Sequence, residues 1–158
     1  MKIAIAQINS TIGDFDGNSN KIVDAWQRAD TAGAELVVLP ELALCGYPPR
    51  DLLAKQVFLR QNQSALDRLA KRSGKAVAVV GYASINETNS GRPAQNSAAV
   101  LQDGQVTAVR HKTLLPTYDV FDEDRYFEPA TDNTPVDIHG TKVGITICED
   151  IWNDEVYL

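Results

Sequence analysis

Three short runs of mainly apolar residues each stop at a side chain that can take part in chemistry. The runs, with the residue that follows each, are 36–40 with Glu41, 106–111 with Lys112, and 143–147 with Cys148. Short apolar runs between turn-forming residues predict buried β-strands. The open ends of strands are also where α/β sheets usually place a ligand crevice. A carboxylate, an ammonium and a thiol gathered there are the groups that covalent hydrolysis of an amide requires.

The first 40 residues predict a strand, a helix and a second strand. Residues 2–8 are rich in Ile and Ala, and residues 36–39 form the next apolar run. Between them, Asn18 or Ser19 can cap a helix whose apolar residues recur at helical spacing and which ends at Ala32-Gly33. Such a unit favours parallel strands joined by a right-handed crossover.

The rest of the chain predicts more helix and a mixed sheet. A helical stretch opens at Asp51, and a longer helix follows that Gly74 closes before a strand at 76–82. Asp103-Gly104 is a strong hairpin signal between two apolar runs, and His139-Gly140 predicts a second hairpin within residues 134–147. Because a hairpin forces an antiparallel pair, the sheet cannot be purely parallel.

The composition indicates one globular domain of a soluble protein. The 158 residues are 44% apolar and 23% charged, and the net charge of −6 argues against nucleic acid or an anionic membrane as partner. No window approaches the roughly 18 apolar residues of a membrane helix, and the first residues resemble a strand more than a signal peptide. Two cysteines, Cys45 and Cys148, are too few for a disulfide framework. They predict reduced thiols in the cytoplasm.

Each of the three reactive residues also has a plain structural explanation. A cysteine that ends an apolar strand is most often an inert buried residue. However, Glu149-Asp150 follow Cys148 where a longer strand would be apolar, which predicts a polar turn that exposes the thiol beside backbone N–H groups. Glu41 follows a proline and could simply occupy the first turn of a helix. Lys112 could be a solvated lysine at the end of a strand.

The order and flanks of these residues resemble the Glu–Lys–Cys triad of the nitrilase, or carbon–nitrogen hydrolase, superfamily. The flanking motifs are more specific than the triad. They are Pro-Glu-Leu at 40–42, Gly-Tyr-Pro-Pro-Arg-Asp-Leu-Leu at 46–53, Lys-Thr-Leu-Leu-Pro at 112–116, Tyr-Asp-Val-Phe-Asp-Glu-Asp-Arg-Tyr-Phe at 118–127, and Ile-Cys-Glu-Asp-Ile-Trp at 147–152. In these motifs the whole chain is similar to the glutaminase domains of glutamine-dependent NAD(+) synthetases.

The resemblance implies a role for each matching residue. Cys148 would be the nucleophile, Glu41 the proton acceptor and Lys112 the cationic stabiliser. Among the residues on the substrate side, Tyr118 would match the glutamine-contacting tyrosine and Glu123 the second, positioning glutamate, and Tyr47 would line the same pocket. The backbone N–H of Glu149 would help to hold the oxyanion. The implied fold is α/β, part of a four-layer α-β-β-α sandwich with a mixed sheet.

The resemblance also implies a reaction and its partners. The substrate would be L-glutamine, hydrolysed through a cysteine thioester without a metal or cofactor. The ammonia would pass to a synthetase domain that uses ATP and Mg to convert deamido-NAD to NAD. This chain contains no phosphate-binding glycine cluster of the kind that domain would need. Relatives of this kind imply a cytoplasmic homo-oligomer.

The last ten residues lack the signals that usually end a helix or a domain. Leu158 lies ten residues past Cys148 with no C-cap glycine or proline, so residues 1–158 are predicted to be a truncated N-terminal part of the hydrolase domain. Another nitrilase-type amidase or carbamoylase remains an alternative, as does a non-catalytic scaffold with this fold. A redox sensor with a disulfide between Cys45 and Cys148 is a third.

Overall fold

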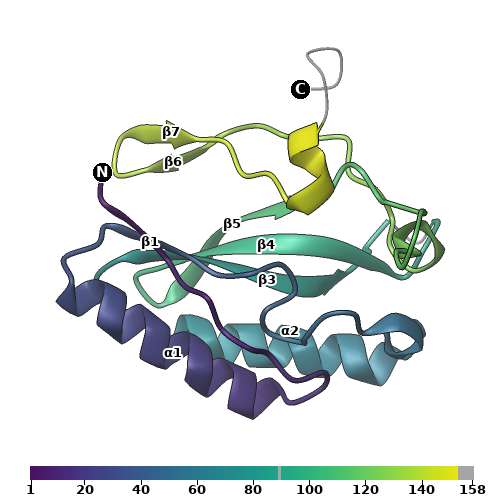
Figure 1. The fold of residues 1–158 in the computed structure, drawn as a ribbon, viewed down its shortest axis with the longest axis horizontal. Coiled ribbons are helices and arrows are strands. Elements are labelled where there is room, and N and C mark those ends of the chain that lie inside the picture. Colours follow the sequence, from purple (N-terminus) through teal and green to yellow (C-terminus); the bar gives the residue numbers. More distant parts are fainter. Residues whose placement is uncertain (89, 153–158) are drawn as a thin grey trace.

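The computed structural model, which describes residues 1–88 and 90–152, is built in three layers. A central sheet has two α-helices on one face and a two-stranded hairpin on the other (Figure 1). The α/β class is confirmed, and the layers correspond to the α-β-β part of the predicted sandwich. The predicted truncation at Leu158 lies outside the described residues.

The elements follow the predicted order with shifted ends. The central strands are β1 (Ile3–Ile5), β2 (Leu36–Val38), β3 (Val77–Ile85), β4 (Ala94–Gln102) and β5 (Gln105–His111), and the hairpin strands are β6 (Val136–Ile138) and β7 (Thr141–Val143). The helices are α1 (Phe15–Thr31) and α2 (Gln56–Ala70), with short 3-10 helices η1 (Arg50–Ala54), η2 (Glu123–Arg125) and η3 (Cys148–Trp152). Thus β1 is shorter than expected, and α2 ends four residues before Gly74.

The central sheet is mixed, as the sequence predicts. Its strands lie in the order β1-β2-β3-β4-β5, with parallel pairing up to β3 and antiparallel pairing from β3 to β5. Asp103 and Gly104, in the turn between β4 and β5, have φ angles of 51° and 80°. His139 and Gly140 repeat this pattern between β6 and β7, with φ angles of 50° and 78°. Two consecutive positive φ angles are the backbone that tight hairpins prefer.

The start of α1 differs from the prediction. The helix begins at Phe15, because the side chain of Asp14 accepts a hydrogen bond from the backbone N–H of Gly17 at 2.9 Å. Asn18 is therefore inside the helix, where its buried side chain binds backbone atoms of Thr11 and Leu44. The proposed caps at Asn18 and Ser19 are wrong, because the asparagine is used to fasten two loops rather than to start the helix.

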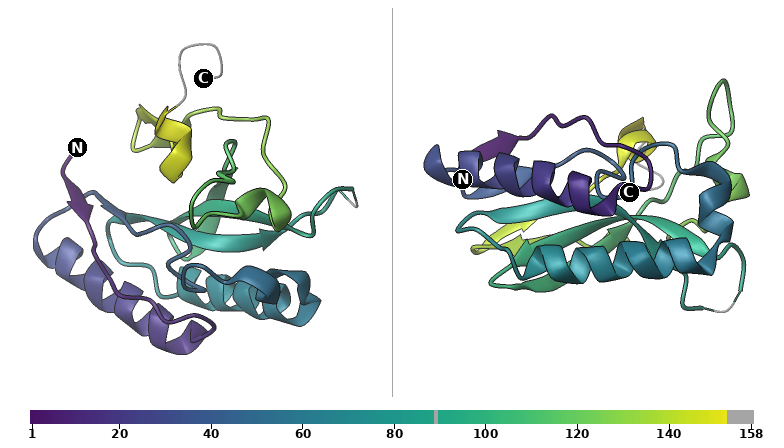
Figure 2. Two further views of the ribbon diagram at one scale, coloured as in Figure 1. Left: turned by 45° about the vertical axis from the view of Figure 1, so that its right-hand side comes forward. Right: turned by 90° about the horizontal axis from the view of Figure 1, so that it is seen from below.

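Both α-helices pack against the same face of the sheet. Figure 2 shows them side by side below the strands. Apolar side chains of α1 and α2 share one buried cluster with those of the strands, and the indole N–H of Trp26 donates to the carbonyl of Ala76 at 2.8 Å. Within the part of the chain that the structure describes, no helix is long and apolar enough to cross a membrane.

The hairpin covers the opposite face. Ile138 and Ile147 pack there against Val79 and Val100 of the central sheet. Among the described residues, ladder pairing in this region stops at Val143, so the predicted strand through residue 147 is too long. The unpaired residues 144–147 still run over the sheet and bring η3, which starts at Cys148, to the ends of β2 and β5.

Candidate active site

Lys112 is a charged side chain that is completely buried. It follows β5 directly, and its backbone N–H donates to the carbonyl of Asn96 at 2.8 Å. Its Nζ donates to Glu41 Oε1 and to Glu123 Oε2, both at 2.8 Å. Burial alone would lower the pKa of Lys112, but the two carboxylates outweigh it and the pKa is raised. A buried, doubly paired ammonium is incompatible with the simple explanation of a solvated lysine.

Glu41 reaches this ammonium from the loop after β2. Its side chain is about 20% exposed. The loop lies directly on β3 because residue 81 is glycine: a Cβ on Gly81 would come within 2.4 Å of both the backbone nitrogen of Leu42 and the carbonyl oxygen of Pro40. The N–H of Leu44 also donates to the Gly81 carbonyl at 3.0 Å. The carboxylate is thus held by backbone packing and is not part of a helix, which removes the second simple explanation.

Glu123 is the second carboxylate on Lys112, and it is more enclosed than Glu41. It belongs to η2 and is 5% exposed. The hydroxyl of Tyr47 donates to its Oε1 at 3.2 Å, while Lys112 occupies its Oε2. Burial, followed by the nearby charge of Glu41, raises the pKa of Glu123 even though Lys112 opposes the shift. The cluster therefore combines one ammonium with two carboxyl groups in different environments.

Asn96 is a member of this cluster that the sequence prediction missed. It lies on β4, is 1% exposed, and its Nδ2 donates to Glu41 Oε1 at 2.6 Å. The same nitrogen is 3.5 Å from Glu123 Oε2. The available signal was an asparagine within a run of small and apolar residues, because a polar side chain on a buried strand needs a partner.

Cys148 enters the site from the layer above the sheet. It is exposed, and its backbone has a φ of 49°, in the left-handed region that residues other than glycine rarely adopt. It lines a cavity of about 220 Å³ together with Glu41. The surrounding protein, followed by the charge of Glu41, raises the pKa of the thiol, and Lys112 lowers it. The exposed thiol fits the predicted turn and not an inert core cysteine, although it follows an unpaired segment instead of a strand.

Asp150 is buried and holds the cysteine turn in place. Its side chain accepts four hydrogen bonds. Three reach Oδ1, from the backbone N–H groups of Thr113 and Leu114 at 2.9 Å and from the Thr113 hydroxyl at 2.8 Å. The fourth joins the N–H of Ile147 to Oδ2 at 3.0 Å. Asp150 thus links the residue before Cys148 to the residues after Lys112.

The predicted substrate contacts fall into two pairs. The hydroxyl of Tyr118 lies 2.9 Å and 3.1 Å from the two carboxylate oxygens of Glu149, next to Cys148. Tyr47 is paired with Glu123 instead. The structure therefore brings Tyr118 to the cysteine side of the site and Tyr47 to the far side of the carboxylate cluster.

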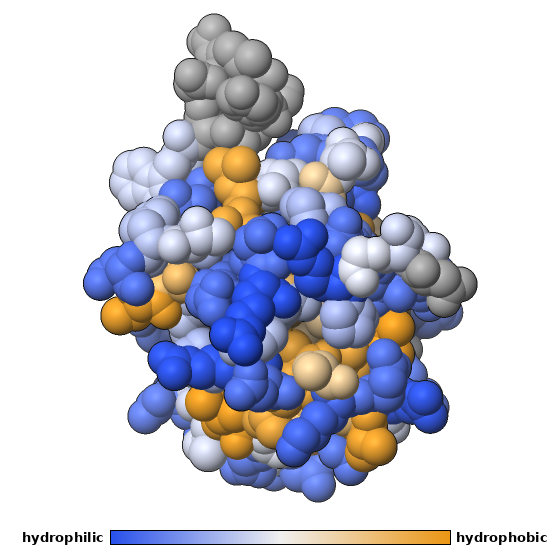
Figure 3. Space-filling view, turned by 90° about the vertical axis from the view of Figure 1, so that its right-hand side faces the viewer, coloured by the Kyte–Doolittle hydropathy of each residue, from blue (hydrophilic) through white to orange (hydrophobic). Residues whose placement is uncertain are grey.

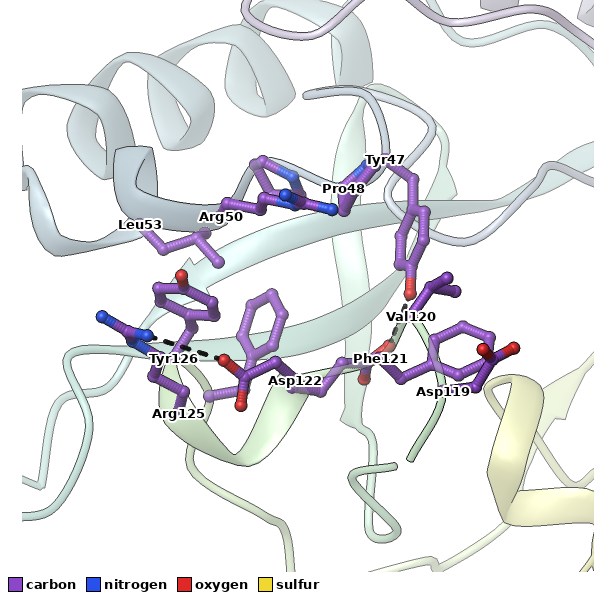
Figure 4. Close-up of a pocket in the computed structure, with 13 residues that line it drawn as sticks. Tyr47, Pro48, Arg50, Leu53, Asp119, Val120, Phe121, Asp122, Arg125 and Tyr126 are labelled. Carbon is purple, nitrogen blue, oxygen red and sulfur yellow. Dashed lines mark hydrogen bonds and ion pairs between the residues drawn. The ribbon is translucent and has the colours of Figure 1, made fainter. Parts of the chain in front are cut away.

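A second cavity of about 280 Å³ adjoins the far side of this cluster (Figure 4). Tyr47 and Glu123 belong to its wall, and Arg50 and Arg125 contribute positive charge. In Figure 4 the hydroxyl of Tyr47 points across the cavity toward the wall that contains Phe121. On the side of the molecule seen in Figure 3, hydrophilic residues are interspersed with hydrophobic ones. Cys148 is not among the residues that line this cavity; it lines the smaller one together with Glu41.

The described residues form no group of three or more His, Cys, Asp and Glu side chains suited to a metal ion. The other thiol, Cys45, is fully buried, and burial raises its pKa to about 12. The reactive groups that remain are an exposed thiol, a buried ammonium and a partly exposed carboxylate. Such a set can attack a carbonyl carbon, stabilise an oxyanion and move a proton.

Comparison with known proteins identifies relatives of this chain. A model of the family described as "Carbon-nitrogen hydrolase" matches residues 2–158. A glutamine-dependent NAD(+) synthetase of Synechocystis sp. is 45% identical over 98% of this chain and 28% of its own length. The chain thus spans little more than a quarter of the curated relatives it matches first.

Two solved structures are similar in fold. The glutamine-dependent NAD+ synthetase of Acinetobacter baumannii superimposes with a TM-score of 0.87 and 37% identity, over 96% of this chain and 28% of that one. An amidase from Nesterenkonia sp. gives a TM-score of 0.76 and 25% identity, over 96% of this chain and 56% of that one.

Proposed function

The chain belongs to the carbon–nitrogen hydrolase family, and from this premise we propose that it hydrolyses the side-chain amide of L-glutamine through a thioester on Cys148. One observation carries the proposal. Cys148 and Glu41 line the same cavity, and the buried ammonium of Lys112 contacts that same carboxylate. Three groups from distant parts of the chain are thereby available to a single carbonyl group.

The first half of the reaction forms the thioester. The Cys148 sulfur attacks the amide carbon while its proton moves to Glu41. The ammonium of Lys112 and the backbone N–H of Glu149 stabilise the oxyanion, and each such donor contributes about 3–4 kcal/mol in comparable sites. When the C–N bond breaks, Glu41 returns its proton to the nitrogen and ammonia leaves.

The second half regenerates the enzyme. Water gives one proton to Glu41 and adds to the thioester carbon, and the C–S bond then breaks to release glutamate. Glu41 returns the proton to the Cys148 sulfur. Lys112 cannot serve as the base, because its raised pKa keeps it protonated. The raised pKa of Cys148 means that the resting thiol is protonated, so a base is needed for the attack.

The substrate contacts and the partner domain are part of the same proposal. Tyr118 and Glu149 would contact glutamine beside Cys148, while Tyr47 and Glu123 would shape the opposite wall. In the relatives named glutamine-dependent NAD(+) synthetase the matched region is 26–28% of the protein. Residues 1–158 would accordingly supply ammonia to a synthetase domain that uses ATP and Mg to make NAD from deamido-NAD, in a cytoplasmic homo-oligomer.

The test measures ammonia release by the full-length gene product. Glutamine should be hydrolysed far faster than simple aliphatic amides, and Cys148→Ala should abolish the release. Cys45→Ala is the matched control, because it removes the buried thiol that does not line the cavity. Mass spectrometry of the quenched reaction should detect an acyl group on Cys148. Unchanged hydrolysis in Cys148→Ala would overturn the proposal and favour a non-catalytic role for the thiol.

A broader amidase is the second candidate. It is supported by the similarity to the Nesterenkonia amidase, a protein in which acrylamide adds to the active-site cysteine of one mutant. If that function is correct, aliphatic amides should be hydrolysed at least as fast as glutamine.

A further inference from the structure

The two carboxylates that share Lys112 differ in how their oxygens are occupied. Both oxygens of Glu123 accept hydrogen bonds, Oε1 from Tyr47 and Oε2 from Lys112. In Glu41 both donors converge on Oε1, with Lys112 Nζ at 2.8 Å and Asn96 Nδ2 at 2.6 Å. Among the residues that the structure describes, none donates to Glu41 Oε2.

Asn96 is held where it can make this distinction. Its backbone carbonyl accepts from the N–H of Lys112, so the two residues are neighbours across β4 and the end of β5. Its planar carboxamide offers two N–H bonds in fixed directions, one toward Glu41 and one toward Glu123. Lys112 alone fixes the orientation of the Glu41 carboxylate less well, because the N–H bonds of an ammonium lie in no fixed plane and Lys112 is shared between the two carboxylates.

The other polar atom of the Asn96 side chain, Oδ1, makes no hydrogen bond within the described structure that could explain the position of the residue. Within the described residues its Oδ1 is buried and has no hydrogen-bond partner. Turning the amide over would place that oxygen against the carboxylate oxygens, which repel it, so the orientation is fixed by the network. A buried acceptor without a partner is unfavourable, so the hydrogen bonds that the N–H groups donate must outweigh its cost.

From these contacts, and resting on the glutaminase function proposed above, we propose that Asn96 is a positioning residue that holds Glu41 through Oε1. Glu41 Oε2 is thereby left as the oxygen that exchanges protons with Cys148, the departing ammonia and water. The other charged or titratable groups around Glu41 are Lys112, Glu123 and the Tyr47 hydroxyl. None of them can replace a neutral donor without changing the charge of the cluster or leaving its own partner.

The test uses Asn96→Leu in the full-length gene product, with Asn62→Leu as a matched control. Asn62 is also a fully buried asparagine whose Nδ2 donates, to the carbonyl of Ala83 at 2.7 Å, and whose Oδ1 has no partner in the described structure. It lies on α2, and within the described residues its side chain makes no hydrogen bond to Glu41 or Glu123. Both variants lose one buried donor, but only Asn96→Leu should affect the chemistry.

The expected loss in kcat for Asn96→Leu is about 10- to 100-fold, which corresponds to one hydrogen bond to a charged group. KM should change less than about threefold, because Asn96 acts on Glu41 and not on the substrate. Asn96→Asp, which keeps the shape but adds a negative charge, should be at least as slow. Asn96→Asp therefore tests the inference even if Asn96→Leu does not fold.

Two results would overturn the inference. One is a wild-type kcat for Asn96→Leu or Asn96→Asp. The other is an equal loss of kcat for Asn62→Leu, which would indicate a general effect of damage to the core. Failure of the underlying function is distinguishable, because in that case Cys148→Ala would retain the hydrolysis of glutamine.

Discussion

Asp150→Asn should lower the free energy of unfolding of the domain, and the hydrogen bonds that the substitution breaks determine by how much. The asparagine keeps one oxygen, which can still accept from the two N–H groups and the hydroxyl at residues 113 and 114. Its NH₂ group must then face the N–H of Ile147, which at present donates to Oδ2 at 3.0 Å. One buried donor loses its partner, and this costs about 1–3 kcal/mol in the free energy of unfolding.

Two further variants calibrate this value. Asp150→Ala removes the acceptor for all four donors and should cost more, about 4 kcal/mol or above if water does not enter. Thr113→Val removes only the hydroxyl that lies 2.8 Å from Oδ1 and should cost about 0.5–1.5 kcal/mol. The expected order of destabilisation is therefore Asp150→Ala, then Asp150→Asn, then Thr113→Val.

Urea unfolding of the full-length gene product measures these differences, and the rate of alkylation of Cys148 in the native state reports on the turn. Because Asp150 links the residue before Cys148 to the residues after Lys112, the alkylation rate should change in both Asp150 variants and not in Thr113→Val. A wild-type unfolding midpoint for Asp150→Asn, or a larger effect of Thr113→Val than of Asp150→Asn, would refute the reasoning.

Alkylation of Cys148 by iodoacetamide should reach half its maximal rate above the pH of about 8.5 at which a free cysteine does, because the raised pKa lowers the thiolate fraction at any given pH. Lys112→Met should move that midpoint higher still, since Lys112 lowers the thiol pKa, and a midpoint below that of free cysteine would contradict this. Cys45 should stay unlabelled until the protein is unfolded. Gly81→Ala should lower the free energy of unfolding by about 1–3 kcal/mol, because the new Cβ would collide with the loop that carries Glu41. For the same reason it should reduce glutamine hydrolysis more than a substitution on the opposite face of β3 does. Equal activity of Gly81→Ala and wild type would show that the loop can move without affecting Glu41.

The sequence predicted the architecture well because the signals were local. Apolar runs identified the strands, and Asp103-Gly104 identified the hairpin that makes the sheet mixed. The errors lie where a side chain serves another segment. Asn18 resembles a helix cap, but it fastens residues of two loops, so the real start of α1 could not be recognised from nearby residues.

The site shows the same division. The triad residues, and the pairing partners Tyr118 and Glu149, carry recognisable flanking motifs. Asn96 lies in none of these motifs, and Asp150 lies in the motif at 147–152 without a role assigned to it. The importance of both depends on contacts across 55 and 37 positions of the chain. A charged residue in a turn is usually solvated, but the four donors around Asp150 make its burial favourable.

The left-handed backbone of Cys148 lowers the stability of the fold at the position that carries the exposed thiol. A φ of 49° costs an ordinary residue about 1–3 kcal/mol, and glycine adopts it freely. Glycine at position 148 would therefore relax the turn and make the folded chain harder to unfold, but the molecule would lose its exposed sulfur. A search for more stable variants of this protein that ignored catalysis would remove its proposed nucleophile early.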